Sequence, residues 1–307
     1  MTGARTPAKR RYAYGNPLCS PKVVPYVFMT PFILYFLLIY LYPTVSTVLM
    51  SFQRIDGPNN VTFIGLLNYE RLFTRNYFLA LETTTRYTVW NVLILVPVPL
   101  LFATLLNSTC VKGAQVFKSI FFIPALTSVI VAGIVFRLAF GSLDTALVNR
   151  LALLLGGESR DWLMQAGTGN FVLIVLTLWR WLGVNIVYFY SGLQAIPRDL
   201  YEAAQIDGAN ALRQFRHVTL PGVRPVLIYV ITLCVLGGFS MFTESVALWQ
   251  QNNPGGVGRT IVGYMYMMGF YRNNMGMASA VGLTLLVLVL AANLLQLAVM
   301  GFFKKEE

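Results

Sequence analysis

Charged side chains are scarce in this chain: they make up 11% of its 307 residues, against about 25% in an ordinary soluble domain. Hydrophobic residues make up 56%, and the mean hydropathy is +0.63. This balance excludes a soluble globular domain. Crossing the hydrocarbon core of a membrane takes about 20 mostly apolar residues per helix, and stretches of that kind recur along the chain. The sequence therefore predicts an all-α polytopic membrane protein.

About six segments are long and apolar enough to be transmembrane helices. They cover residues 26–52, 84–106, 120–140, 171–190, 226–246 and 278–302. The first follows a basic stretch, as the apolar part of a signal peptide does, but it is too long and lacks a small-residue cleavage site. We therefore expect it to be a retained helix, and we expect residues 26–302 to form one transmembrane domain.

Residues that carry chemistry are also few. The three cysteines, Cys19, Cys110 and Cys234, have neither metal-ligand spacing nor the pattern of a disulfide framework. His217 is the only histidine and lies in a polar loop, where a solvated surface role is far commoner than a catalytic one. The sequence has no phosphate-binding glycine loop and no nucleophile–base pair. We therefore expect no catalytic residue, no metal site and no cofactor bound by this chain.

Acidic residues number 12 and basic residues 23, which gives a net charge of +11. The basic residues concentrate in alternate loops and at the two ends, namely at Arg5, Lys9, Arg10, Arg11, Lys22, Lys112, Lys118, Arg198, Arg213, Arg216, Arg224, Lys304 and Lys305. Because Lys and Arg gather in cytoplasmic loops, both termini are predicted to be cytoplasmic, with tails at 1–25 and 303–307. The positive charge therefore indicates the membrane topology of the chain and does not indicate nucleic-acid binding.

One polar segment, EAAQIDGANALRQFRHVTLP at 202–221, interrupts two apolar spans. Pro197 suits the first turn of a helix, and Glu202 lies near the positive end of that helix. Gly208 can adopt the left-handed conformation that ends a helix. A second short helix is predicted beyond it by apolar residues at about 3.6-residue spacing, namely Leu212, Phe215 and Val218. Two short helices joined at a glycine would form a compact, projecting elbow.

This segment resembles the EAA loop of binding-protein-dependent ABC importer permeases. The resemblance rests on Glu202-Ala203-Ala204, then three residues, Gly208, nine residues and Val218-Thr219-Leu220-Pro221. The fuller string AIPRDLYEAAQIDGANALRQFRHVTLPGVRP is similar to the carbohydrate-uptake branch, of the maltose-transporter type. Further fragments occur in the family's order, namely YPTVSTVLMSF, FIGLLNYERLF, FIPALTSVIVAGIVFRLAF, YMYMMGF and GMASAVG.

The chain departs from the family in the outer loop before the last span. The family has a Gly-Gly-Gly-Pro-type turn there, whereas this chain has QQNNPGGVGRT at 250–260. The turn keeps the residue types of the family at Gly255, Gly256 and Thr260. The positions that are shifted are Asn252, Asn253 and Pro254. The departure bears on the contacts of the outer loop.

The resemblance implies a type I ABC importer permease fold and half of a translocation pathway for a sugar or related solute. It also implies a second, similar permease, two copies of a cytoplasmic ATPase that bind the ATP and Mg²⁺, and an extracytoplasmic solute-binding protein. The location implied is the cytoplasmic membrane of a prokaryote. Within the EAA loop at 197–221, the residues implied to couple to the ATPase are Glu202, Ala203, Ala204, Asp207, Gly208, Leu220 and Pro221.

Span four carries a charge at its middle. Arg180 lies where a charge costs about 3 kcal/mol on insertion scales, so it is expected to face a cavity or a partner. Trp181, Asn185 and Tyr188 follow on one face of the helix, and aromatic rings beside amide donors suit a sugar. We expect this face to line the solute path, with Trp179 and Arg180 near it. In the alternative, Arg180 pairs with an acid, and Glu244 toward the outer end of span five is the candidate.

Two other classes of function remain open at this stage. An ion-gradient-driven secondary transporter usually shows internal repeats and intramembrane acids, and here no repeat is evident and Glu244 is the only acid placed inside a span. A membrane enzyme would need converging ionisable or metal-binding groups, and none is evident.

Small residues at Gly276, Ala278, Ala280 and Gly282 suggest close helix packing, with ordinary small-residue content as an equal alternative.

The charge distribution makes a testable prediction about topology. In a cysteine-free background, single cysteines at Asn60 and Asn253 should react with an impermeant thiol reagent added outside the cell. A cysteine at Gln214 should not react until the membrane is made permeable. The reverse labelling pattern would overturn the topology and the assignment of the polar loop to the cytoplasm.

Overall fold

The computed structural model describes residues 22–55, 60–108, 111–249 and 256–302. Most of the basic N-terminal tail, residues 250–255 of the outer loop, including the Asn253 label position, and the C-terminal tail at 303–307 lie outside the described residues. The described part is almost entirely helical. Its one sheet is an antiparallel pair of short strands, β1 (Gln53–Ile55) and β2 (Val61–Phe63), with Arg54 opposite Thr62.

The helices follow one another with short connections. The first part of the chain contains α1 (Val24–Tyr35), the π-helical η2 (Phe36–Leu41), α2 (Tyr42–Ser51), α3 (Leu67–Leu72), α4 (Arg75–Leu95), α5 (Pro97–Asn107), α6 (Ala114–Leu126), α7 (Val129–Ala139) and α8 (Leu147–Leu154). The second part contains α9 (Ala166–Gln194), α10 (Arg198–Ile206), α11 (Ala211–Gln214), η3 (Phe215–Thr219), α12 (Leu220–Gly222), α13 (Arg224–Phe239), α14 (Thr243–Trp249), α15 (Ile261–Tyr266), η5 (Met267–Tyr271) and α16 (Met275–Val299).

Four helical stretches are each long and apolar enough to cross a membrane: Val24–Ser51, Arg75–Asn107, Gly167–Gln194 and Met275–Val299. Two bent pairs bring the number to six if each pair is one span, and they are Ala114–Leu126 with Val129–Ala139, and Ala211–Gly222 with Arg224–Phe239. The predicted span boundaries therefore need correction. Span two begins at Arg75 and not at residue 84, which also places Glu82 inside a spanning helix.

The predicted third and fifth spans are not straight helices. In the third, α6 and α7 meet at 93°, because Pro124 in the last turn of α6 lacks an N–H and Thr127 adopts an extended conformation. The fifth stops at Phe239, seven residues before the predicted end at 246. The glycine pair Gly237 and Gly238 precedes that stop, and glycine is a weak helix former.

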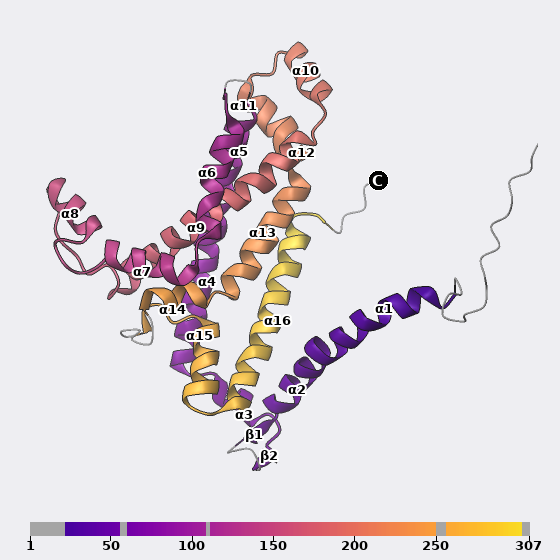
Figure 1. Ribbon diagram of the computed structural model, residues 1–307, viewed down its shortest axis with the longest axis vertical. Helices are drawn as coiled ribbons and strands as arrows, with labels where there is room; N and C mark the ends of the chain where they lie inside the picture. The colour runs from indigo at the N-terminus through magenta and orange to yellow at the C-terminus, as the bar shows by residue number, and fades with distance from the viewer. Residues whose placement is uncertain (1–21, 56–59, 109–110, 250–255, 303–307) are drawn as a thin grey trace, which may run out of the picture.

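The connections predicted to be cytoplasmic lie toward one end of the molecule. The α5–α6 connection and the elbow of α10 and α11 are at the top of Figure 1, and the end of α16 is turned the same way. Arg224 at the start of α13 donates a hydrogen bond to the Met300 carbonyl, which ties these two ends together. The β1–β2 hairpin, α3 and the start of α16 lie toward the opposite end.

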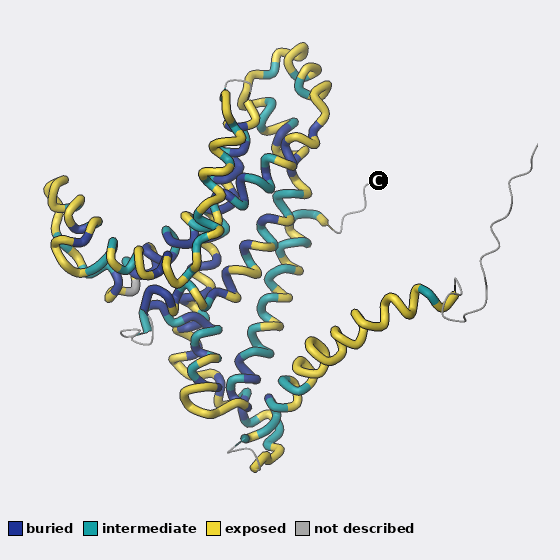
Figure 2. The backbone as a smooth tube through the Cα atoms, in the orientation of Figure 1, coloured by how far each residue is buried: buried dark blue, intermediate teal, exposed yellow. Residues whose placement is uncertain are grey.

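The first span stands apart from the rest. No residue of α1 or η2 is buried, and Figure 2 shows this segment exposed along its length. Its last part, α2, packs against α16. The buried core therefore belongs to the other helices, in three clusters. One joins α5, α9 and α13, one joins α4, α7, α9 and α14, and one joins α3, α4, α15 and α16.

The small residues at the start of α16 pack inside this chain. A Cβ at Gly276 would overlap the carbonyl oxygen of Gln53 in β1, Ala280 is fully buried, and a Cβ at Gly282 would crowd the sulfur of Met265 in α15. Ala278 meets Gly269 in η5. The close approach that the spacing suggested is therefore made to β1, α15 and η5.

The closest helix–helix approach makes a prediction about stability. A Cβ at Gly183 of α9 would overlap the backbone of Phe121 and Phe122 in α6. Gly183→Ala should therefore lower the free energy of unfolding by about 1–3 kcal/mol, the usual cost of overpacking. Gly167→Ala is the matched control on the same helix, because nothing lies within 4 Å of its Cβ position. Thermal unfolding of the purified protein in detergent measures both, and equal stability of the two variants would contradict the close packing.

Candidate functional site

The predicted elbow is built by local backbone chemistry. The α10 helix ends at Ile206, and Gly208 follows with a φ of 74°, the left-handed conformation expected of it. The Ala209 N–H then donates to the Ala204 carbonyl at 2.9 Å. The Asn210 side chain accepts from the Arg213 N–H at 2.9 Å and begins α11. Pro197 differs from expectation by one position, since it is the residue before α10 and not inside its first turn.

The elbow is held to the body of the protein from both of its helices. Tyr201 of α10, and Phe215 and Val218 of η3, pack against the cluster that includes Phe189 of α9 and Val230 of α13. The Tyr201 and Thr219 hydroxyl groups lie 3.0 Å apart and join the two arms of the elbow. Its helical run continues through Pro221 to Gly222, where α12 meets α13 at a bend of 69°. The elbow is therefore a rigid extension of α9 and α13.

The outer face of the elbow is exposed. Glu202, Ala203, Asp207 and Gly208 are exposed and Ala204 is half-buried, and Leu220 and Pro221 are exposed at its base. The most exposed apolar side chains there are Ile206, at 87% exposure, and Leu212, at 75%. Sequence reasoning missed Ile206, and it named Leu212 only for the helical spacing that it shares with Phe215 and Val218. Their signal was available, because a bulky apolar residue beside a predicted turn has no place to be buried within a short elbow.

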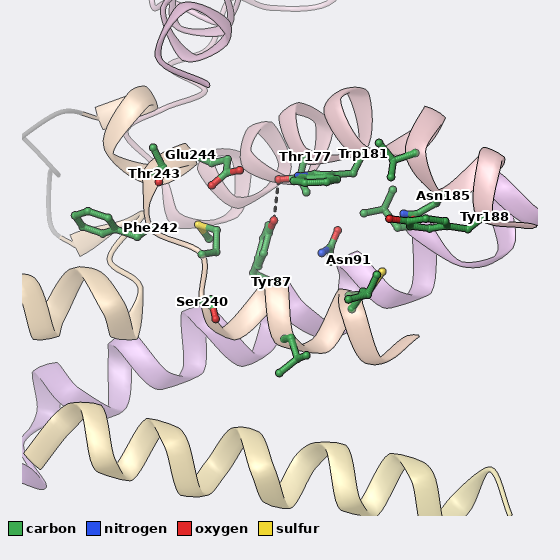
Figure 3. A pocket seen from close by; sticks show the side chains of 17 residues that line it. Tyr87, Asn91, Thr177, Trp181, Asn185, Tyr188, Ser240, Phe242, Thr243 and Glu244 are labelled. Carbon is green, nitrogen blue, oxygen red and sulfur yellow. Dashed lines mark hydrogen bonds between the residues drawn. The ribbon is translucent and has the colours of Figure 1, made fainter. Parts of the chain in front are cut away.

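A cavity of about 450 Å³ lies between α4, α9, α13 and the start of α14. That volume is within the range of about 300–1,000 Å³ usual for small-molecule sites. Figure 3 shows side chains from these elements around the cavity, with Tyr87 and Asn91 on one side and Trp181, Asn185 and Tyr188 on another. The cavity lies where two core clusters adjoin, since Leu95 and Cys234 of one and Tyr87 and Met241 of the other line it.

The residues predicted for the solute path divide into two groups. Trp181, Asn185, Tyr188 and Glu244 line the cavity. Trp179 instead packs against Phe136 of α7, with ring centroids 5.7 Å apart. Arg180 does not line the cavity, and its guanidinium group forms an ion pair.

Arg180 pairs with Glu244, as the alternative to the path role supposed. Arg180 Nη1 lies 2.8 Å from Glu244 Oε1, and the side chains are 13% and 15% exposed. The sequence analysis placed Glu244 inside the fifth span, toward its outer end, from which Arg180 would have had to reach outward. The structure corrects the span, because Glu244 lies beyond the end of α13, in α14. The chain leaves α13 at Phe239, turns, and begins α14 at Thr243, which brings Glu244 to the side of α9.

Several cavity residues were missed in the sequence. Tyr87, Asn91 and Leu95 of α4 form a stripe at four-residue spacing, which places them on one helix face. The Tyr87 and Thr177 hydroxyls lie 2.7 Å apart and join α4 to α9 beside the cavity. Polar residues at this spacing inside a predicted span were the available signal. The sequence contained no such signal for Ser240 and Phe242, because their position in the cavity wall depends on the turn after α13.

The family of sequences described as the binding-protein-dependent transport system inner membrane component matches residues 96–303. This stretch includes the elbow and most of the cavity. The chain belongs to this family. It is therefore a transport subunit, the permease of an ABC importer, and not an enzyme, and it is a multi-pass membrane protein.

Known relatives match this chain over nearly its whole length. The arabinooligosaccharides transport system permease protein AraP of Bacillus subtilis is 50% identical over 97% of this chain and 95% of its own. The protein of the same description from Halalkalibacterium halodurans is 50% identical over 93% of this chain and 90% of its own. In structure, a chain of a bacterial ABC transporter involved in the import of the acidic polysaccharide alginate has a TM-score of 0.80 at 22% identity, over 92% of this chain and 96% of that one. The predicted fold is thereby confirmed.

Proposed function

We propose that this permease forms half of the translocation pathway of an importer for arabinose-containing oligosaccharides or closely similar uncharged sugars. The 50% identity to permeases described for arabinooligosaccharides supports this class of solute. The cavity chemistry supports it as well, because the Trp181 and Tyr188 rings can stack on the C–H faces of a sugar while Asn91 and Asn185 hydrogen-bond its hydroxyls.

The importer contains a second, similar permease that supplies the other half of the path. Two ATPase subunits bind ATP and Mg²⁺ in the cytoplasm, and a solute-binding protein delivers the sugar from outside. Both termini and the elbow face the cytoplasm of a prokaryotic cell, as the Lys and Arg distribution indicates. This chain supplies the elbow and one wall of the path.

One observation carries the proposal: α9 and α13 both line the cavity and hold the elbow. A side chain of the elbow such as Phe215 touches the same packed cluster as Cys234, which faces the cavity. Packed interiors transmit displacement and do not absorb it. Closure of the ATPases against the elbow can therefore move the cavity walls, which is the coupling that ATP-driven import needs.

The elbow geometry predicts a separation between insertion and coupling. Gly208→Val forces a β-branched residue into the left-handed conformation, at a cost of about 1–2 kcal/mol, and Glu202→Lys reverses a charge on the exposed face. Each variant should insert normally, recover much less ATPase in a pull-down and lose sugar uptake. Gly156→Val is the control, because Gly156 has a similar φ of 79° and lies in the loop after α8, away from the elbow. Wild-type ATPase recovery and uptake in both elbow variants would refute the coupling role.

The cavity lining predicts that some variants lose transport although the importer still assembles. The complete importer in proteoliposomes should take up arabino-oligosaccharides only with ATP and the solute-binding protein, and an ionophore should have no effect. Asn185→Leu and Tyr188→Leu should each cut uptake about 5- to 30-fold, because a lost hydrogen bond or stacking contact amounts to about 1–2 kcal/mol. ATPase docking should be unchanged.

Two results would count against this function. Uptake that is abolished by the ionophore and independent of ATP would favour a secondary transporter. Wild-type uptake by both variants at every solute concentration would show that this face of α9 is not the path.

A further inference from the structure

The ion pair beside the cavity is asymmetric. Glu244 lines the cavity and Arg180 does not, although a 2.8 Å contact joins them. Figure 3 shows Glu244 at the cavity edge near Thr177, with Trp181 beyond it. A second pair, Glu82 with Arg86 on α4, is looser at 3.9 Å and more exposed. The two partners of the cavity pair thus have different surroundings, and their roles can be separated.

The Glu244 carboxylate has acceptor capacity to spare. An ionised carboxylate offers about four lone-pair sites, and Arg180 Nη1 occupies one of them on Oε1. Among the described residues no second hydrogen bond to this carboxylate is made. Arg180 Nε is buried and has no hydrogen-bond partner in the described part of the chain, so the pair is joined through Nη1 and is not bidentate. Because Glu244 lines the cavity, its remaining lone pairs are the acceptors that this residue can offer to a solute there.

The pair is not needed to hold α14 in place. The Ser245 hydroxyl donates to the Gly258 carbonyl at 2.6 Å, and the Trp249 indole N–H donates to the Leu163 carbonyl at 2.8 Å. Ala247 packs so closely on α7 that a Cβ at Gly133 would overlap it. These three contacts anchor α14 independently of Arg180. A buried charge kept beside a cavity without a clear anchoring role indicates a role toward the solute.

We propose that Glu244 determines specificity by accepting hydrogen bonds from the hydroxyl groups of an uncharged sugar, and that Arg180 is the positioning residue that holds this carboxylate at the cavity wall. The inference rests on the proposed function, since it assigns a role within the same cavity. A hydroxyl bound to a carboxylate makes a stronger hydrogen bond than one bound to an amide. The Trp181 ring, 5.7 Å from the Arg180 guanidinium carbon, offers an apolar surface for the sugar on the adjoining side.

The first test separates recognition from assembly by measuring two rates in the same proteoliposomes. Glu244→Gln keeps the shape of the side chain and one acceptor. ATP hydrolysis stimulated by the sugar-loaded binding protein should stay within about twofold of wild type. Sugar uptake should fall about tenfold, the effect of replacing a charged acceptor by a neutral one. The sugar carried per ATP hydrolysed should fall accordingly. Glu82→Gln is the matched control and should change neither rate.

The second test exchanges the two charges. The double variant Arg180→Glu with Glu244→Arg restores an ion pair but moves the carboxylate to α9, away from the cavity wall. It should assemble and hydrolyse ATP, yet its uptake should stay as low as that of Glu244→Gln. Arg180→Lys keeps a cation beside Glu244 and should retain most of the uptake, whereas Arg180→Gln should lose it.

Each of the two tests has a result that would overturn the proposal. Uptake restored by the charge exchange, or wild-type uptake per ATP in Glu244→Gln, would overturn the proposal and leave the pair a structural contact. Should the exchanged pair fail to assemble, Glu244→Gln alone decides. An importer whose wild-type form carries no sugar at all would instead refute the proposed function, because that result does not depend on Glu244.

Discussion

The need to pair every backbone polar group inside the chain governs this structure. Hydrocarbon offers no hydrogen-bond partner, so the spanning segments are helices, and irregular backbone is tolerated only where protein or a cavity surrounds it. The turn after α13 is a helix interruption that obeys this rule. It contains Ser240, and this residue lines the cavity. The cavity is thus bordered by a point at which a helix ends.

The same constraint explains the ion pair. An isolated charge at the level of Arg180 would be costly, and the turn after α13 is what delivers Glu244 to it. A straight fifth span would have carried that acid away along its axis. The interruption therefore has two effects. It closes one end of the cavity, and it places a paired carboxylate in the cavity wall.

How far the sequence predicted these features depended on the range of the interactions involved. The elbow was predicted well, because Gly208 and the turn around it are set by backbone chemistry within a few residues. The spans were found by their apolar length. Their bends were not, since Pro31 lies inside α1 without a sharp bend whereas Pro124 accompanies one. The partner of Arg180 stayed open because it lies 64 positions away and depends on the turn after α13.

The link between elbow and cavity follows from how tightly their common helices are packed. Near the elbow, a Cβ at Gly192 of α9 would overlap Val226 of α13, and one at Gly222 would overlap Ile196. Both contacts are with side chains, so sliding one element past the other would require repacking the core. The two helices joined in this way hold the elbow and also line the cavity, with residues such as Trp181 and Cys234. In the coupling proposed above, a force on the elbow would therefore reach the cavity through both helices.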